Sequence, residues 1–138
     1  MSQLKIIMGL KGSGKTKHFI ELVTRAIADE KGHIVCLERG NRLTYDLPHA
    51  VRLIQSTDYN FNGYDFMKGF IAGLHSGDYD ITHIFIDSVL RIFGEQYSAE
   101  AEDFFDWIDE FGEKHGVRFT LMVSADAELA TERAKKYF

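Results

Sequence analysis

The stretch "IIMGLKGSGKT", from Ile6 to Thr16, decides how the rest of the chain is interpreted. It begins with a short apolar run and continues into three closely spaced glycines. Glycine weakens strands and helix interiors, because it loses more conformational freedom on folding than any other residue. Gly9, Gly12 and Gly14 therefore indicate a tight loop between a strand and a helix.

This stretch satisfies the pattern G-x-x-x-x-G-K-[ST] of the phosphate-binding P-loop, or Walker A motif. The backbone N–H groups of such a loop, at the start of a helix, form a concave anion site. We expect Lys15 to reach the β- and γ-phosphates of a nucleotide and the hydroxyl of Thr16 to bind Mg²⁺. The residues expected to contact the nucleotide here are Gly9, Lys11, Gly12, Ser13, Gly14, Lys15, Thr16 and Lys17.

Length and composition are typical of one soluble globular domain, which we expect to span residues 1–138. The net charge of −5 argues against a general affinity for nucleic acids or anionic membranes. No apolar stretch approaches the roughly 18 residues of a membrane span, and the N-terminus lacks a signal-peptide pattern. The single cysteine, Cys36, excludes an internal disulfide framework. The expected location is cytoplasmic.

Apolar periodicity alternates between strands and helices along the whole chain, which predicts an α/β fold. It is expected to be a three-layer sandwich, with a mainly parallel sheet covered on both faces. The expected strands are residues 4–8, 34–37, 51–54, 81–86 and 117–123. The expected helices are residues 15–30, 64–76 and 99–115, with a final helix that Asp126 caps and that runs to the C-terminus.

An aspartate occupies the position expected of a second metal ligand. Asp87 ends the apolar strand 81–86, as the aspartate of a Walker B strand does, and we expect it to bind Mg²⁺ together with Thr16. Asp78 and Asp80 precede that strand and are interpreted as turn residues. The six histidines show no metal-ligand spacing, so a zinc site is not expected.

The order of the phosphate loop, "HIVCLERG" (33–40), "HIFIDSVLRIFG" (83–94) and "RFTLMVSAD" (118–126) resembles the nucleotide core of RecA-like P-loop ATPases. The resemblance covers about residues 3–126 and extends to small stand-alone P-loop proteins predicted to bind ATP. It implies that Glu38 polarises the attacking water, as a catalytic residue beside Lys15, and that Ser124 contacts the γ-phosphate. The alternative for Glu38 is an exposed glutamate that merely begins a loop.

The chain also departs from that family. It lacks the DNA-binding loops, and its core is truncated, because the usual fifth core strand is missing. We therefore expect the phosphate-loop strand or a neighbour near a sheet edge, covered by the final helix or paired in a homodimer. No arginine finger can be named from Arg39, Arg42, Arg91 and Arg118, although Arg39 and Arg42 are favoured because they follow the second strand.

These observations predict a protein that binds Mg·ATP and hydrolyses it slowly. ATP is favoured over GTP, because no guanine-recognition motif is evident. One alternative is a small-molecule kinase of the nucleoside type, for which residues 38–63 are the only room for a lid or acceptor pocket. The other is a nucleotide-dependent switch or adaptor that does not hydrolyse ATP and signals through an unidentified protein partner.

Overall fold

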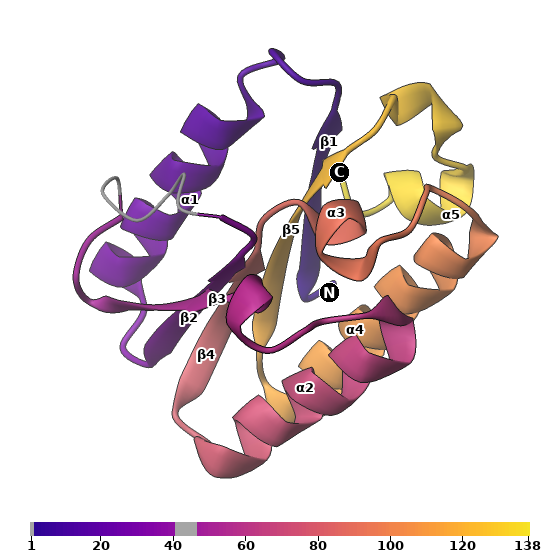
Figure 1. Ribbon diagram of the computed structural model, residues 1–138. Coiled ribbons are helices and arrows are strands. Elements are labelled where there is room, and N and C mark those ends of the chain that lie inside the picture. The colour runs from indigo at the N-terminus through magenta and orange to yellow at the C-terminus, as the bar shows by residue number, and fades with distance from the viewer. Residues whose placement is uncertain (1, 41–46) are drawn as a thin grey trace.

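A computed structural model describes residues 2–40 and 47–138. Its centre is a five-stranded sheet in the order β1-β5-β4-β2-β3, in which every neighbouring pair is parallel (Figure 1). The strands lie where the sequence predicts them, with each end within one residue. They are β1 (Leu4–Gly9), β2 (His33–Glu38), β3 (Val51–Gln55), β4 (Ile81–Ile86) and β5 (Arg118–Ser124).

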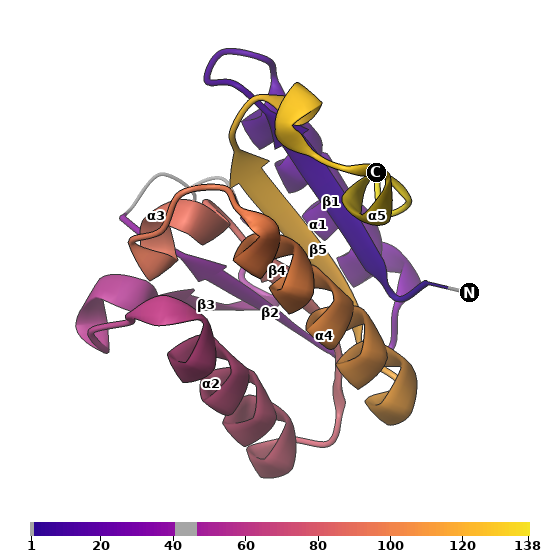
Figure 2. The ribbon, with the colours of Figure 1, turned by 90° about the vertical axis from the view of Figure 1, so that its right-hand side faces the viewer.

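Helices cover both faces of this sheet, so the predicted three-layer α/β sandwich is confirmed (Figure 2). One face carries α1, and the other carries α2, α3 and α4. The helices are α1 (Lys15–Asp29), α2 (Gly63–Gly77), α3 (Val89–Phe93), α4 (Ala99–His115) and α5 (Glu132–Lys135). None of the helices in the described residues is long and apolar enough to cross a membrane.

Two helical predictions need correction. The final helix does not run from Asp126 to the C-terminus: Asp126 caps a 3₁₀ turn at Ala127–Leu129 by accepting a hydrogen bond from the Glu128 N–H, and the four-residue helix α5 follows. Helix α3 is absent from the sequence-based prediction, because five residues are too few to show helical periodicity.

Alternation along β2 shows how the sheet fills both apolar layers. Val35 and Leu37 belong to the core under α2, α3 and α4, whereas Ile34 and Cys36 belong to the core under α1. Because successive side chains of a strand point to opposite faces, a nearly continuous apolar run is what a strand covered on both faces requires. All four side chains are buried.

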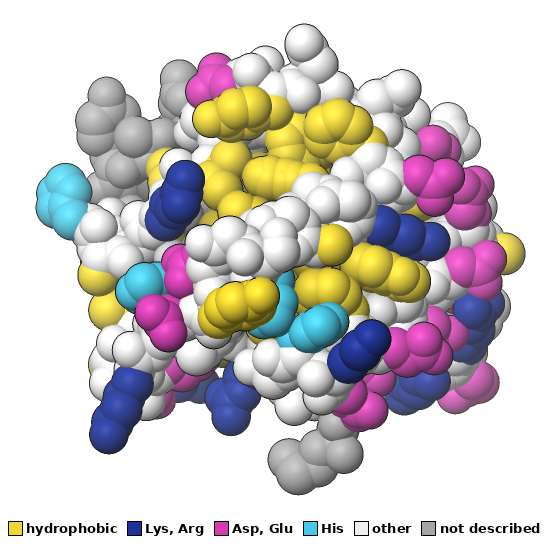
Figure 3. Space-filling model, turned by 90° about the horizontal axis from the view of Figure 1, so that it is seen from below, with side chains coloured by type: hydrophobic (Ala, Val, Ile, Leu, Met, Phe, Trp, Pro, Cys, Tyr) yellow, Lys and Arg dark blue, Asp and Glu magenta, His cyan; other side chains and the backbone are white. Residues whose placement is uncertain are grey.

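Ring contacts join the outer helices α2 and α4. The ring of His75 on α2 lies 4.6 Å from that of His115 on α4, and Phe111 lies 4.4 Å from His115, between ring centroids. Seen from below, histidine and hydrophobic side chains gather on the same face of the molecule (Figure 3). Aromatic packing therefore closes this end of the outer layer.

β1 is an edge strand, as the truncated core predicts, and no strand of the described residues pairs with its outer side. The C-terminal segment covers part of that edge: the Ile6 N–H donates to the carbonyl of Tyr137 at 2.8 Å. The Tyr137 side chain is buried, and its hydroxyl donates to Asp106 of α4 at 2.5 Å. The observed covering comes from Tyr137, which follows α5, rather than from the final helix as predicted, and the homodimer stays untested.

We predict that Tyr137→Ala lowers the free energy of unfolding by about 3 kcal/mol, because it removes a buried ring that fastens the C-terminal segment. Phe138→Ala is the matched control, since Phe138 is 46% exposed. Its expected cost is below about 1 kcal/mol. Urea denaturation of both variants measures the difference. Similar losses would contradict a specific role for Tyr137.

Candidate functional site

The loop between β1 and α1 requires its glycines for conformational and steric reasons. Gly12 and Gly14 have φ angles of +88° and +83°, in the left-handed region that side chains disfavour. At Gly9, a Cβ atom would lie 2.8 Å from the Oγ of Ser13. The local backbone is therefore one that alanine at any of these positions would strain or crowd.

The loop delivers backbone and side-chain donors to one place. Gly14 is the N-cap of α1, so Lys15, Thr16 and Lys17 form its first turn. The first N–H groups of a helix have no partner within the helix and carry a partial positive charge. The Nζ atom of Lys15 donates to the carbonyl of Leu10 at 3.0 Å, so this ammonium group lies back across the loop.

A cavity of about 560 Å³ opens beside this loop. Its walls come from the loop, from α1, from the strand end of β5 and from α3. Of the described residues that line it, four are lysine or arginine and none is acidic. The lining residues are Lys11, Gly12, Gly14, Lys15, Thr16, Lys17, Ser88, Arg91, Met122 and Ser124. In a chain of net charge −5, this cavity gathers positive charge and suits an anion.

Asp87 lies directly after β4 and is fully buried. Its N–H donates to the carbonyl of Leu37 at 2.9 Å, and its Oδ1 accepts a hydrogen bond from the Ser88 hydroxyl at 2.9 Å. Ser88 has φ +55°, an uncommon conformation for a residue other than glycine, and lines the cavity. Asp87 thus lies behind the cavity wall, joined to it through Ser88.

Glu38 is also fully buried, so the alternative of an exposed glutamate is wrong. Leu37 and Ile86 are register partners on β2 and β4, and Glu38 and Asp87 are the residues that follow them. The pKa of the Cys36 thiol is raised well above its usual value, chiefly by burial and further by the charges of Asp87 and Glu38. Two carboxylates are therefore buried close together at adjacent strand ends, where oxygen ligands fit a cation such as Mg²⁺.

The structure brings together most of the residues predicted for the nucleotide. Lys11, Gly12, Gly14, Lys15, Thr16, Lys17 and Ser124 all line the cavity, whereas Gly9, Ser13, Glu38 and Asp87 do not. Gly9 is the register partner of Ser124, so β5 ends directly beside the start of the loop. Their roles toward a nucleotide stay predictions.

The arginines are arranged differently from what the sequence favours. Arg39 lines a separate cavity of about 220 Å³, together with Ser56 and Thr57, and Arg42 lies outside the described residues. Arg118 begins β5, at the end of that strand opposite to Ser124. Among the arginines of this group that the structure describes, Arg91 lines the phosphate-loop cavity. Its place depends on α3, which the sequence does not reveal.

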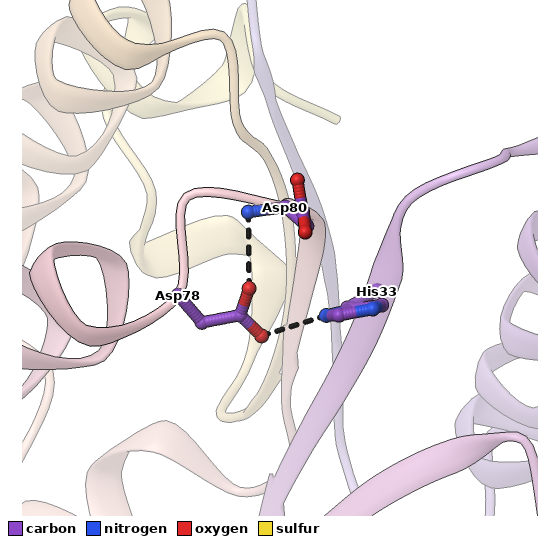
Figure 4. Close-up of side chains that lie close together, drawn as sticks. All are labelled: His33, Asp78 and Asp80. Atoms are coloured by element: carbon purple, nitrogen blue, oxygen red, sulfur yellow. Dashed lines mark hydrogen bonds and ion pairs between the residues drawn. The ribbon is translucent and has the colours of Figure 1, made fainter.

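A second polar cluster, drawn in Figure 4, lies at the amino ends of β2 and β4, whereas the phosphate loop follows the carboxyl end of β1. His33 Nδ1 and Asp78 Oδ2 are 2.7 Å apart, and the Asp80 N–H donates to Asp78 Oδ1 at 3.0 Å. Ligand atoms of His33, Asp78 and Asp80 lie within 4.8 Å of one another, a proximity that residue spacing alone does not predict. The hydrogen bonds agree with the interpretation of both aspartates as turn residues before β4.

A buried histidine, His83, lies near the amino end of β4. His83 Nδ1 is 2.7 Å from Glu30 Oε2, and His83 Nε2 is 2.9 Å from the Thr120 hydroxyl. Because a carboxylate only accepts, Nδ1 carries the proton, and neutral Nε2 then accepts from Thr120. Burial lowers the pKa of His83, an effect that Glu30 partly opposes. These two hydrogen bonds join Glu30, the residue after α1, to β4 and β5 through a neutral imidazole.

The chain matches no protein-family model and no curated protein sequence. Among solved structures it is similar to the flagellar accessory protein FlaH from Methanocaldococcus jannaschii, with a TM-score of 0.60 and 14% sequence identity. The match covers 98% of this chain and 66% of FlaH, so the chain spans just under two thirds of FlaH's length. At this identity the similarity supports the RecA-like fold alone.

We predict that His83 and His33 make the stability of the protein depend on pH in opposite directions. The pKa of His83 is lowered from 6.5, so its contribution to stability is complete above pH 6.5 and is lost as pH falls through its folded-state pKa. The pKa of His33 is raised from 6.5, mainly by the Asp78 hydrogen bond, so its contribution is complete below pH 6.5 and is lost as pH rises through its folded-state pKa.

The prediction is checked by measuring the free energy of unfolding of the parent, His83→Gln and His33→Gln at pH values below and above 6.5. The stability difference between the parent and His83→Gln should shrink only below pH 6.5. The difference for His33→Gln should shrink only above pH 6.5. If the stability differences of the two variants changed with pH in the same direction, the environments of His83 and His33 would not control the titration of these side chains.

Proposed function

We propose that this protein binds Mg·ATP in the cavity beside the phosphate loop and hydrolyses it slowly. The observation that carries the proposal is the joint lining of one cavity by a Walker A loop, a helix N-terminus and four cationic side chains. Phosphate groups are recognised by this combination of backbone N–H groups and fixed positive charge. The RecA-like fold shared with FlaH supports the proposal at the level of architecture.

The residues present fit a magnesium ion. Thr16 lines the cavity and offers a hydroxyl oxygen, and Asp87 offers a carboxylate behind Ser88. Mg²⁺ prefers oxygen ligands and in phosphate sites is held by one or two protein groups together with the phosphates. When bound, the ion would neutralise developing charge on the phosphates.

Glu38 is the proposed base. Water is a poor nucleophile, and a carboxylate within reach can orient it and accept its proton. Glu38 ends β2, at the edge of the sheet where the carboxyl ends of the parallel strands meet the phosphate loop. Its buried position keeps the carboxylate in one place and limits exchange with bulk solvent.

Lys15→Ala tests the nucleotide site. We predict that the affinity for Mg·ATP falls by about a hundredfold, because the variant loses a cation that contacts several phosphate oxygens. The matched control is Lys31→Ala, which removes an exposed lysine between α1 and β2. Isothermal titration with ATP and Mg²⁺ measures both. If Lys15→Ala binds like the parent, the phosphate-loop assignment fails.

Glu38→Gln tests hydrolysis separately from binding. The amide keeps the size of the side chain but cannot accept a proton, so ATP turnover should fall on the order of a hundredfold while affinity stays near that of the parent. Phosphate release under saturating ATP measures turnover, and titration measures affinity. Unchanged turnover would remove Glu38 from the mechanism. If the parent protein binds ATP but does not hydrolyse it, the alternative of a nucleotide-dependent switch or adaptor is favoured instead.

A further inference from the structure

Helix α3 is a core element with one exposed side chain. Its other four residues, Val89, Leu90, Ile92 and Phe93, are buried in the apolar layer, whereas Arg91 is exposed. The exposed side chain lines the phosphate-loop cavity, with Lys15 and Thr16. The packing of α3 therefore presents a single guanidinium to the proposed nucleotide site.

Both ends of α3 are bounded by a residue in the left-handed backbone region. Ser88 precedes the helix with φ +55°, and Gly94 follows it with φ +69°. Ser88 also donates to Asp87, so the helix begins at the proposed metal ligand. Because the four buried side chains hold the helix against the core, the direction of Arg91 is set by packing rather than by a surface loop.

The guanidinium is available to a ligand. Within the part of the chain that the structure describes, Arg91 takes part in no ion pair or side-chain hydrogen bond. Among residues 2–40 and 47–138, no acidic side chain lines its cavity. An arginine offers planar pairs of N–H donors that match two oxygens of one phosphate. The described lining of the cavity thus offers no carboxylate that would compete with a phosphate for this group.

We propose that Arg91 contacts the terminal phosphate of the bound nucleotide and makes the site selective for a nucleoside triphosphate over a diphosphate. This rests on the proposed function. The loop and the first turn of α1 supply one set of donors, and Arg91 comes from a separate element on the same cavity. A nucleoside triphosphate carries one more phosphate group than a diphosphate. In this proposal, that terminal phosphate is the group that contacts the Arg91 guanidinium.

Selectivity is measured by isothermal titration of a non-hydrolysable ATP analogue and of ADP, both with Mg²⁺. In Arg91→Ala the dissociation constant for the ATP analogue should rise at least about tenfold, and that for ADP by no more than about twofold. Arg91→Lys keeps the charge but loses the paired donors, so its loss should be intermediate. Arg118→Ala is the matched control, since it removes one exposed arginine at the opposite end of β5.

Each outcome supports or overturns the inference. Selective loss for the ATP analogue in Arg91→Ala, absent in Arg118→Ala, supports it. Equal weakening of both nucleotides would show only a general electrostatic effect, and unchanged binding would show no contact; both overturn it. Circular dichroism checks that each variant is folded. If Arg91→Ala is unfolded, the binding data of Arg91→Lys decide the question. A parent that binds neither nucleotide overturns the proposed function, whereas a parent that binds both without Arg91 dependence overturns this inference alone.

Discussion

Parallel pairing of β1, β5, β4 and β2 is the constraint on which the candidate site depends. It brings the carboxyl ends of the four strands to one edge of the sheet. Gly9 on β1 lies beside Ser124 on β5, and Leu37 on β2 lies beside Ile86 on β4. The residues that follow these pairs supply the loop, Glu38 and Asp87. A shift in register would separate them, and the apolar layers on both faces oppose such a shift because every strand residue would change face.

Charge at this edge is divided between two depths. Lysines and Arg91 line the open cavity, whereas the carboxylates of Glu38 and Asp87 are buried at the strand ends. The described lining of the cavity therefore suits an anion.

The truncated core changes how the sheet ends. β1 carries the phosphate loop and is also an edge strand, so its outer side needs a partner. The backbone hydrogen bond from Ile6 to Tyr137 supplies part of that covering, and Asp106 anchors Tyr137 from α4. The C-terminal residues, which contain no residue of the phosphate motif, therefore support the strand from which that motif emerges.

The sequence by itself determined the elements that are long or chemically specific. Five apolar runs predicted five strands, and Gly9, Gly14, Lys15 and Thr16 predicted the loop, because fixed spacing and local backbone demands are written in neighbouring residues. Tertiary structure alone decided the rest. Whether Glu38 is buried depends on the strands beside it, and the place of Arg91 depends on α3, which is too short to show periodicity. The cluster of His33, Asp78 and Asp80 and the burial of His83 likewise arise from strand pairing, which joins residues far apart in the chain.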